Sequence, residues 1–154
     1  MELFVRWAGR EEWEDAMKLA WETFMRYNSS ECRPEGIRSF REFITDERLK
    51  QAFYEGSYQL MVALDGNRIV GLGSLRNVSH LSLLFVDGAY HRRGIGKAIV
   101  TTLCEYLKNE VGEQYVSLTA SPHAVEFYKK LGFTVLSPAT SPMGVPVVPM
   151  EKRI

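Results

Sequence analysis

The hydrophobic period of this chain changes near residue 58, and that change narrows the choice of fold more than any other feature. Before it, apolar residues recur at helical spacing over roughly 10–27: Trp13, Ala16, Met17, Ala20 and Phe24. After it, residues 58–64, 68–75 and 78–86 have the pattern of strands. Asp65-Gly66-Asn67 joins the first two and is a hairpin signal. The chain is therefore predicted to pack helices against a sheet.

The remaining segments extend this pattern in both directions. Residues 3–7 form a short strand candidate, and Pro34 and Gly36 predict an irregular segment after the first helix. A helix carrying Ile37, Phe40 and Ile44 and a short one capped by Asp46 should follow. Downstream we expect a long helix that ends near Val111-Gly112, and then a strand over 115–119. A helix from Ser121 to Gly132 and two closing strands over 133–136 and 145–152 should follow. The order β-α-α-β-β-β-α-β-α-β-β indicates a mixed α/β fold of the α+β type, in one domain over 1–154.

Composition excludes several function classes. The 154 residues carry 19 Lys and Arg against 19 Asp and Glu, so the net charge favours neither nucleic acid nor an anionic membrane as a partner. No apolar run reaches the roughly 18–20 residues of a membrane span, and no signal peptide opens the chain, so we expect a cytoplasmic protein. Cys32 and Cys104 lack metal-type spacing, and no metal site is predicted. Cys104 is expected to be a buried thiol, whereas Cys32 is either a reactive thiol or a bystander.

A glycine-rich turn follows the strand that starts at His80. It reads Arg92-Arg93-Gly94-Ile95-Gly96-Lys97-Ala98 and leads into the long helix. Backbone N–H groups at the positive end of a helix bind phosphate, and glycine at 94 and 96 permits close approach of an anion. A dinucleotide fingerprint is excluded by Ile99, and a Walker A loop by Ala98. The turn alone predicts phosphate binding, with an ordinary glycine-rich connection as the alternative.

Two motifs in this order resemble the GCN5-related N-acetyltransferase (GNAT) superfamily. His91-Arg92-Arg93-Gly94-Ile95-Gly96 is similar to its pyrophosphate motif Gln/Arg-x-x-Gly-x-Gly/Ala, with His at the first position. The segment 121–133 is similar to Asn-x-x-Ala-x-x-Phe-Tyr-x-x-x-Gly-Phe, with Ser121 in place of Asn. The resemblance covers the whole chain and is weakest over 28–55. It implies a central, mostly antiparallel sheet of about six to seven strands flanked by helices, and acetyl-coenzyme A as the acyl donor.

The resemblance also implies roles for individual residues. Tyr128 would be the general acid toward the coenzyme sulfur, His80 a candidate base, and the Leu84 N–H the donor to the thioester oxygen. A core aromatic is the alternative for Tyr128, and a solvent-facing strand-end histidine is the alternative for His80. The implied coenzyme contacts run along the strand end, the turn and the second motif: Leu84, Phe85, Val86, His91, Arg92, Arg93, Gly94, Ile95, Gly96, Lys97, Ala98, Ser121, Ala124 and Tyr128.

The acceptor is less defined by the sequence. Residues 25–55 are expected to form its wall, and they mix basic and acidic side chains without selecting a substrate class. A small amine is the first expectation, and a protein N-terminus or lysine is the second. A non-catalytic acyl-CoA-binding sensor and a nucleotide-binding module stay open as other classes, and a homodimer stays open as an assembly.

Overall fold

Seven strands form one sheet in the order β1-β2-β3-β4-β5-β7-β6 in the computed structural model, which describes residues 2–154. The strands are β1 Leu3–Trp7, β2 Gln59–Asp65, β3 Arg68–Arg76, β4 His80–Val86, β5 Tyr115–Ala120, β6 Thr134–Val135 and β7 Val148–Arg153. Within these residues β4 and β5 are the one parallel pair, and the other neighbours are antiparallel. The expected mostly antiparallel sheet of six to seven strands is confirmed.

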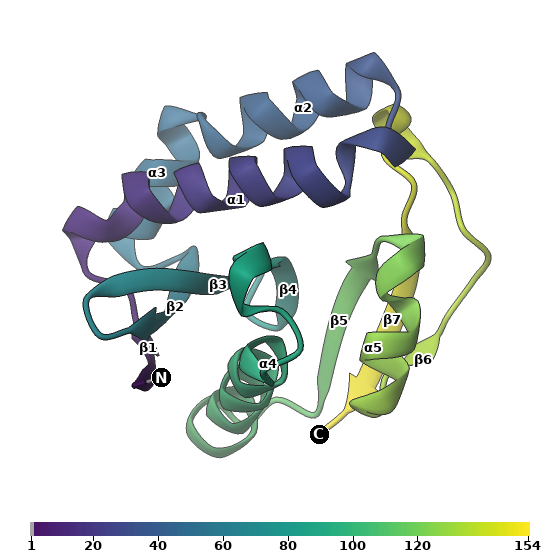
Figure 1. Cartoon of the computed structure of the whole chain (residues 1–154). Coiled ribbons are helices and arrows are strands. Elements are labelled where there is room, and N and C mark those ends of the chain that lie inside the picture. Colours follow the sequence, from purple (N-terminus) through teal and green to yellow (C-terminus); the bar gives the residue numbers. More distant parts are fainter. Residues whose placement is uncertain (1) are drawn as a thin grey trace.

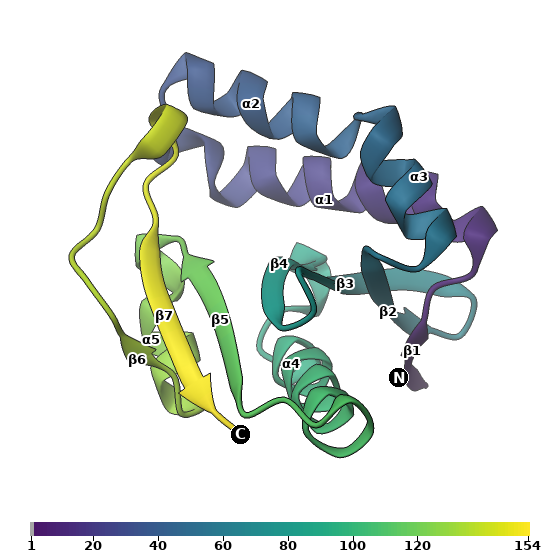
Figure 2. The same cartoon turned by 180° about the vertical axis from the view of Figure 1, so that it is seen from behind.

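Helices cover both faces of this sheet. The long helices α1 and α2 run side by side across one face, with α3 beside them (Figures 1 and 2). Helices α4 and α5 pack against the opposite face, where they share a core with both halves of the sheet. The five helices are α1 Trp13–Tyr27, α2 Pro34–Ile44, α3 Glu47–Glu55, α4 Ile95–Tyr106 and α5 Val125–Lys130. None of the helices in the described part of the chain is long and apolar enough to cross a membrane.

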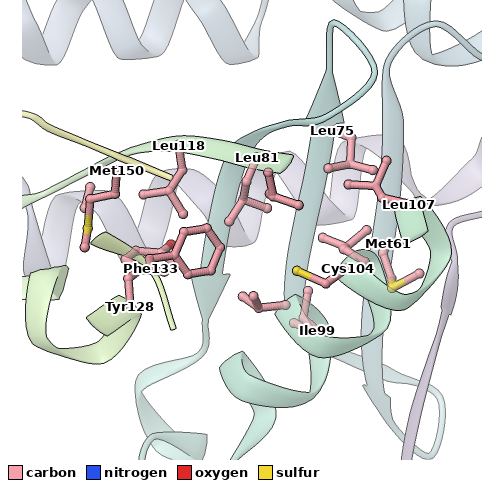
Figure 3. Packing of buried hydrophobic residues seen from close by; sticks show 14 of the residues in the cluster. Met61, Leu75, Leu81, Ile99, Cys104, Leu107, Leu118, Tyr128, Phe133 and Met150 are labelled. Carbon is pink, nitrogen blue, oxygen red and sulfur yellow. The ribbon is translucent and has the colours of Figure 1, made fainter. Parts of the chain in front are cut away.

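Two apolar cores lie on either side of the sheet. The core under α1–α3 includes Trp13, Ala20 and Leu72, and the core toward α4 and α5 includes Ile99 and Met150. Figure 3 shows the second core, in which α4 side chains meet strand residues. A Cβ on Gly73 of β3 would lie 2.5 Å from the Ile99 side chain, so this glycine lets α4 approach the sheet closely. That approach fixes the start of α4 above the end of β4.

The predicted elements are confirmed with a few corrections. Asp46 caps α3 as expected, because its carboxylate accepts the Arg48 N–H at 2.8 Å. The irregular segment predicted at Pro34 and Gly36 is wrong: Pro34 is the first residue of α2, where its missing N–H costs nothing. The strand predicted over 78–86 is β4, and it begins at His80 rather than at Val78. Val78 has a φ of 71° and belongs to the turn after β3.

Candidate active site

The sheet opens between β4 and β5. These parallel strands are paired at His80 with Ser117 and at Leu81 with Leu118, and no further pair joins them within residues 2–154. Beyond Leu81 the two strands run apart, as seen between their labels in Figure 1. The carboxyl end of β4 leads to the glycine-rich turn and α4, and that of β5 leads to α5. The opening therefore faces two helix starts, as a site for an elongated anionic ligand would.

The backbone of β4 presents donors to this opening. N–H groups of successive strand residues point to opposite edges of the strand. The Asp87 N–H bonds the Val70 carbonyl of β3 at 2.8 Å, and the Leu83 N–H also points toward β3, where it bonds Ser74. The N–H groups of Leu84 and Val86 therefore point to the β5 side. Because β5 has already diverged there, these two amides are available to a ligand lying in the opening.

Side chains of the same strand line the two cores. Leu84 and Val86 pack toward α4 and α5, and Phe85 packs toward the helices on the other face. The ring of Phe85 meets Phe40 of α2 edge-on at 5.8 Å between centroids. Residues 84–86, which the sequence predicted to contact the coenzyme, thus place backbone N–H groups at the opening while their side chains pack in the two cores.

The glycine-rich turn carries a set of free N–H groups. Gly94 is the N-cap of α4 with a φ of 78°, a left-handed conformation that glycine adopts without a steric penalty. The N–H groups of residues 93–97 donate to no carbonyl of the described chain, whereas the Ala98 N–H bonds the Gly94 carbonyl at 3.0 Å. The Ala98 N–H is therefore engaged within the helix, and the free donors of the turn end at Lys97. Arg92, Arg93 and Lys97 are exposed around the turn and add positive charge.

Gly96 has a packing role that the sequence did not indicate, and Ile95 lies on the buried stripe of α4, as its helical spacing with Ile99 predicts. The Ile95 side chain is buried in the core, so Ile95 can serve an anion through its backbone alone. A Cβ on Gly96 would lie 3.2 Å from the Phe127 ring of α5 and 3.8 Å from Val86. Phe127 therefore reaches across the opening to the start of α4, and Gly96 leaves room for it.

His91 holds the turn through its side chain. Its Nε2–H donates to the Val86 carbonyl at 2.7 Å, and its ring lies 4.8 Å from that of Tyr27. The Tyr27 hydroxyl occupies the space that a Cβ on Gly88 would need. Tyr27, expected in the acceptor wall, thus contacts the phosphate turn instead. Its position at the end of an amphipathic helix gave no signal of this contact.

Tyr128 lies on α5, the helix that follows the carboxyl end of β5. The residue is 7% exposed, and its ring lies 5.0 Å from that of Phe127. It also packs against the ring of Phe133 (Figure 3). Its hydroxyl makes no hydrogen bond within residues 2–154. Every fully buried side-chain polar atom in that range has a partner, so the Tyr128 hydroxyl cannot be fully buried and must retain some solvent access. Burial raises the pKa of Tyr128 well above its ordinary value, and the phenol stays protonated at neutral pH.

His80 begins β4 on the face that α1–α3 cover. Leu81 and Leu118 enter the α4 core, so the side chains of His80 and Ser117 project on the opposite face. Nδ1 of His80 lies 2.9 Å from Ser117 Oγ. Burial and the charge of Arg76 lower the pKa of His80 below 6.5, so the imidazole is neutral and basic at pH 7. The alternative of a freely solvated strand-end histidine does not fit this environment.

The connection between α1 and α2 closes one side of the site. Glu31 pairs with Nδ1 of His123 at 2.9 Å, just before α5, and the Arg33 N–H bonds the Gly144 carbonyl at 3.0 Å. The Ser121 side chain caps no helix: it lies 3.4 Å from Nε2 of His123. Ala124 is the N-cap of α5 and packs against the core. Segments far apart in sequence thus meet at this rim.

The cysteines stand apart from this chemistry. Burial raises the pKa of both Cys32 and Cys104 above that of an ordinary thiol, and the carboxylate of Glu31 adds to the effect at Cys32. Of the two possibilities for Cys32, the bystander fits this environment better than a reactive thiolate. Cys104 is buried, as expected.

A parallel strand pair that opens beside a helix start defines a fold with a site for an elongated anionic ligand. The chain belongs to the GNAT family, because the family model described as "Acetyltransferase (GNAT) domain" matches residues 28–154. The glucosamine 6-phosphate N-acetyltransferase of Trypanosoma brucei brucei is 38% identical over 76 residues, which are 43% of this chain and 51% of that protein. The chain thus spans about half the length of that curated relative.

Two solved structures share the fold over essentially the whole chain. A GCN5-related N-acetyltransferase from Rhodopseudomonas palustris has a TM-score of 0.84 at 20% identity, covering 100% of this chain and 97% of that one. The PaiA N-acetyltransferase from Thermoplasma acidophilum, solved in complex with coenzyme A, has a TM-score of 0.83 at 21% identity, with both chains covered completely. At these identities the likeness shows a common fold.

Proposed function

We propose that the protein transfers the acetyl group of acetyl-coenzyme A to the amine of a small molecule. The observation that carries the proposal is the set of unpaired donors at one opening, which are the N–H groups of 93–97 and the Leu84 and Val86 amides; the unpaired Tyr128 hydroxyl lies on the adjoining helix α5. Pyrophosphate fits the first group, pantetheine amides fit a strand edge, and a thioester fits between an amide and a phenol. No single part of this series would suggest acetyl transfer by itself.

His80 is the proposed base. An amine of pKa near 10 must lose a proton before it attacks, at a free-energy cost of about 4 kcal/mol at pH 7. The neutral imidazole accepts that proton, directly or through water, as the nitrogen bonds to the thioester carbon. Support comes from the lowered pKa of His80 and from its place on the sheet face that α1–α3 cover, since residues 25–55 are the expected acceptor wall.

Leu84 and Tyr128 act on the acetyl group as negative charge develops. The Leu84 N–H bonds the carbonyl oxygen, which becomes an oxyanion when the tetrahedral intermediate forms. When the carbon–sulfur bond breaks, its electron pair goes to sulfur, and the Tyr128 hydroxyl donates a hydrogen bond and then a proton to that atom. The products are the N-acetylated amine and free coenzyme A.

A small acceptor is favoured over a protein. The rim formed by Glu31, His123 and the Arg33–Gly144 contact bounds the acceptor side with three chain segments. A folded protein surface would need that side to be open. The glucosamine 6-phosphate enzyme among the relatives is named for a small amine acceptor, which points the same way.

The test follows free thiol released from acetyl-coenzyme A across a panel of amino sugars, polyamines, amino acids, and peptides with a free N-terminus or lysine. Release that depends on a small amine supports the proposal. Release with peptides alone would assign a protein acceptor, and tight binding of acetyl-coenzyme A without amine-dependent release would assign a sensor. Thermal protection by ATP or NAD but not by coenzyme A would overturn the donor assignment.

A further inference from the structure

Three hydroxyl groups form a chain beside the opening in the sheet. Ser74 of β3 is 0% exposed and Tyr58, before β2, is 2% exposed. The Tyr58 hydroxyl lies 2.7 Å from Ser74 Oγ and 3.0 Å from Ser82 Oγ of β4. Ser74 Oγ also accepts the Leu83 N–H at 3.0 Å. Nothing in the sequence pattern joined these residues, because they come from three different strands or strand ends.

The protons of this chain have one consistent direction. A phenol has a single proton to donate, and Tyr58 gives it to Ser82. Ser74 must then donate its own proton to the Tyr58 oxygen, which leaves the Ser74 oxygen free to accept from the Leu83 N–H. The direction is therefore Leu83 N–H to Ser74, Ser74 to Tyr58, and Tyr58 to Ser82. Every member is satisfied, which is the condition under which a buried polar network holds one geometry.

The chain lies where the ladder between β3 and β4 is irregular. Gly73 faces Leu84 and Leu75 faces Leu81, so one residue of β3, Ser74, stands opposite two residues of β4. At such a bulge the extra residue loses its place in the backbone ladder. Ser74 Oγ replaces the missing carbonyl and turns the Leu83 N–H toward β3. The next amide, that of Leu84, must then point the opposite way, into the opening.

We propose that Ser74 and Tyr58 are positioning residues that aim the Leu84 amide at the thioester oxygen. Neither side chain contacts the reacting atoms, and both act through the bulge. If Ser74 Oγ is removed, the Leu83 N–H loses its acceptor, and the bulge of β4 at residues 82–83 is no longer held against β3. The Leu84 N–H follows this bulge directly and would lose its fixed direction into the opening. The chemical meaning of this assignment rests on the proposed acetyl transfer.

The amide itself supplies the test. In ¹⁵N-leucine-labelled full-length protein, the Leu84 resonance is identified by its loss in Leu84→Ile. Acetyl-coenzyme A has a thioester carbonyl that free coenzyme A lacks. Acetyl-coenzyme A should therefore move the Leu84 amide proton downfield relative to coenzyme A. Ser74→Ala should abolish that difference. Persistence of the difference in Ser74→Ala, or its absence in the unaltered protein, would overturn the inference.

Two further variants keep the result interpretable if Ser74→Ala folds poorly. Tyr58→Phe removes the second link and should reduce the acetyl-dependent shift. Tyr106→Phe is the matched control, because it removes a phenol that accepts from Gln59 at 2.9 Å outside the chain of hydroxyls, and it should leave the shift unchanged. Equal effects of these two substitutions would refute a positioning role for Tyr58.

Kinetics separate this inference from the proposed function. Ser74→Ala should lower kcat about 10- to 100-fold, which is less than the loss of a whole oxyanion donor, while coenzyme A affinity stays within about threefold. An equal loss of affinity and turnover would indicate general damage and count against the inference. If the acetyl-dependent shift of Leu84 is present but no amine is acetylated, the proposed function fails while the positioning role stands.

Discussion

Removing the Tyr128 hydroxyl should slow acetyl transfer without destabilising the fold, whereas the same change at Tyr58 should destabilise it. Both phenols are buried, at 7% and 2% exposure, so each phenylalanine variant keeps its ring packing. The difference lies in the hydroxyls. That of Tyr128 has no partner within residues 2–154, and that of Tyr58 bonds Ser74 and Ser82.

The expected magnitudes follow from those partners. Tyr128→Phe removes no hydrogen bond of the free protein, so its free energy of unfolding should change by less than about 0.5 kcal/mol. Tyr58→Phe leaves the proton of the buried Ser74 hydroxyl without an acceptor, which costs about 1–3 kcal/mol. A hydrogen bond to a charged group contributes about 1.5–3 kcal/mol. Because about 1.4 kcal/mol corresponds to a factor of ten, Tyr128→Phe should lower kcat about 10- to 100-fold.

Urea unfolding followed by circular dichroism gives the two stabilities, and thiol release at saturating acetyl-coenzyme A gives kcat. Coenzyme A affinity, measured by calorimetry, should be nearly unchanged in Tyr128→Phe. Unchanged turnover would remove Tyr128 from the role of hydrogen-bond and proton donor. A loss of more than about 1 kcal/mol in Tyr128→Phe would show that its hydroxyl has a structural partner, and the contrast with Tyr58 would fail.

Four other outcomes test the site and the packing around it. Gly96→Val should weaken coenzyme A binding at least tenfold in calorimetry, because its side chain would displace Phe127, now 3.2 Å from a Cβ position; unchanged affinity would contradict the assigned anion site. The kcat/KM of the unaltered enzyme should rise with pH to a plateau, with an inflection below pH 6.5, because the pKa of His80 is lowered and its neutral form is the base. This inflection should disappear in His80→Gln. An inflection that persists in that variant belongs to another group. Because the pKa of His80 is lower in the folded protein, the unfolded chain binds the proton more readily. The contribution of His80 to the free energy of unfolding is therefore present above pH 6.5 and is lost as the pH falls through the pKa of the folded state. Urea titrations at several pH values measure this loss. Gly36→Ala should lower the melting temperature, because a Cβ there would overlap the Gly144 backbone; an unchanged melting temperature would show that this contact yields easily.

The sequence was sufficient for the elements and for the glycine-rich turn at the start of α4 because both depend on local pattern. Helical spacing, the Asp65-Gly66-Asn67 hairpin and the two glycines at 94 and 96 are all read within a few residues. The error at Pro34 has the same local origin. Proline is compatible with a loop and with the first turn of a helix, and packing against residues 142–144 decides between them.

The contacts that shape the site could not be predicted in this way because they join distant segments. Tyr27 meets His91 across 64 positions of the chain, and Glu31 meets His123 across 92. The hydroxyl chain depends on a bulge, which no periodicity in the strand reveals. His91 shows the difference well: as a motif position it looked like an atypical phosphate ligand, while its geometry makes it a brace for the turn.

The short junction between β4 and β5 has a mechanical consequence. Within the described chain, two residue pairs join the half-sheet β1–β4 to the half-sheet β5–β7–β6. The two half-sheets are therefore paired at one corner and unpaired along the rest of their shared edge. A ligand bonded to the free strand edge would brace the open corner. Saturation at a hundred times Kd adds about 2.7 kcal/mol to the stability of any protein that binds one ligand in its folded state. Saturating ligand should therefore raise the stability of a variant weakened at this corner by that same amount as long as its Kd is unchanged, and a smaller rise would show that the corner also helps to bind the ligand.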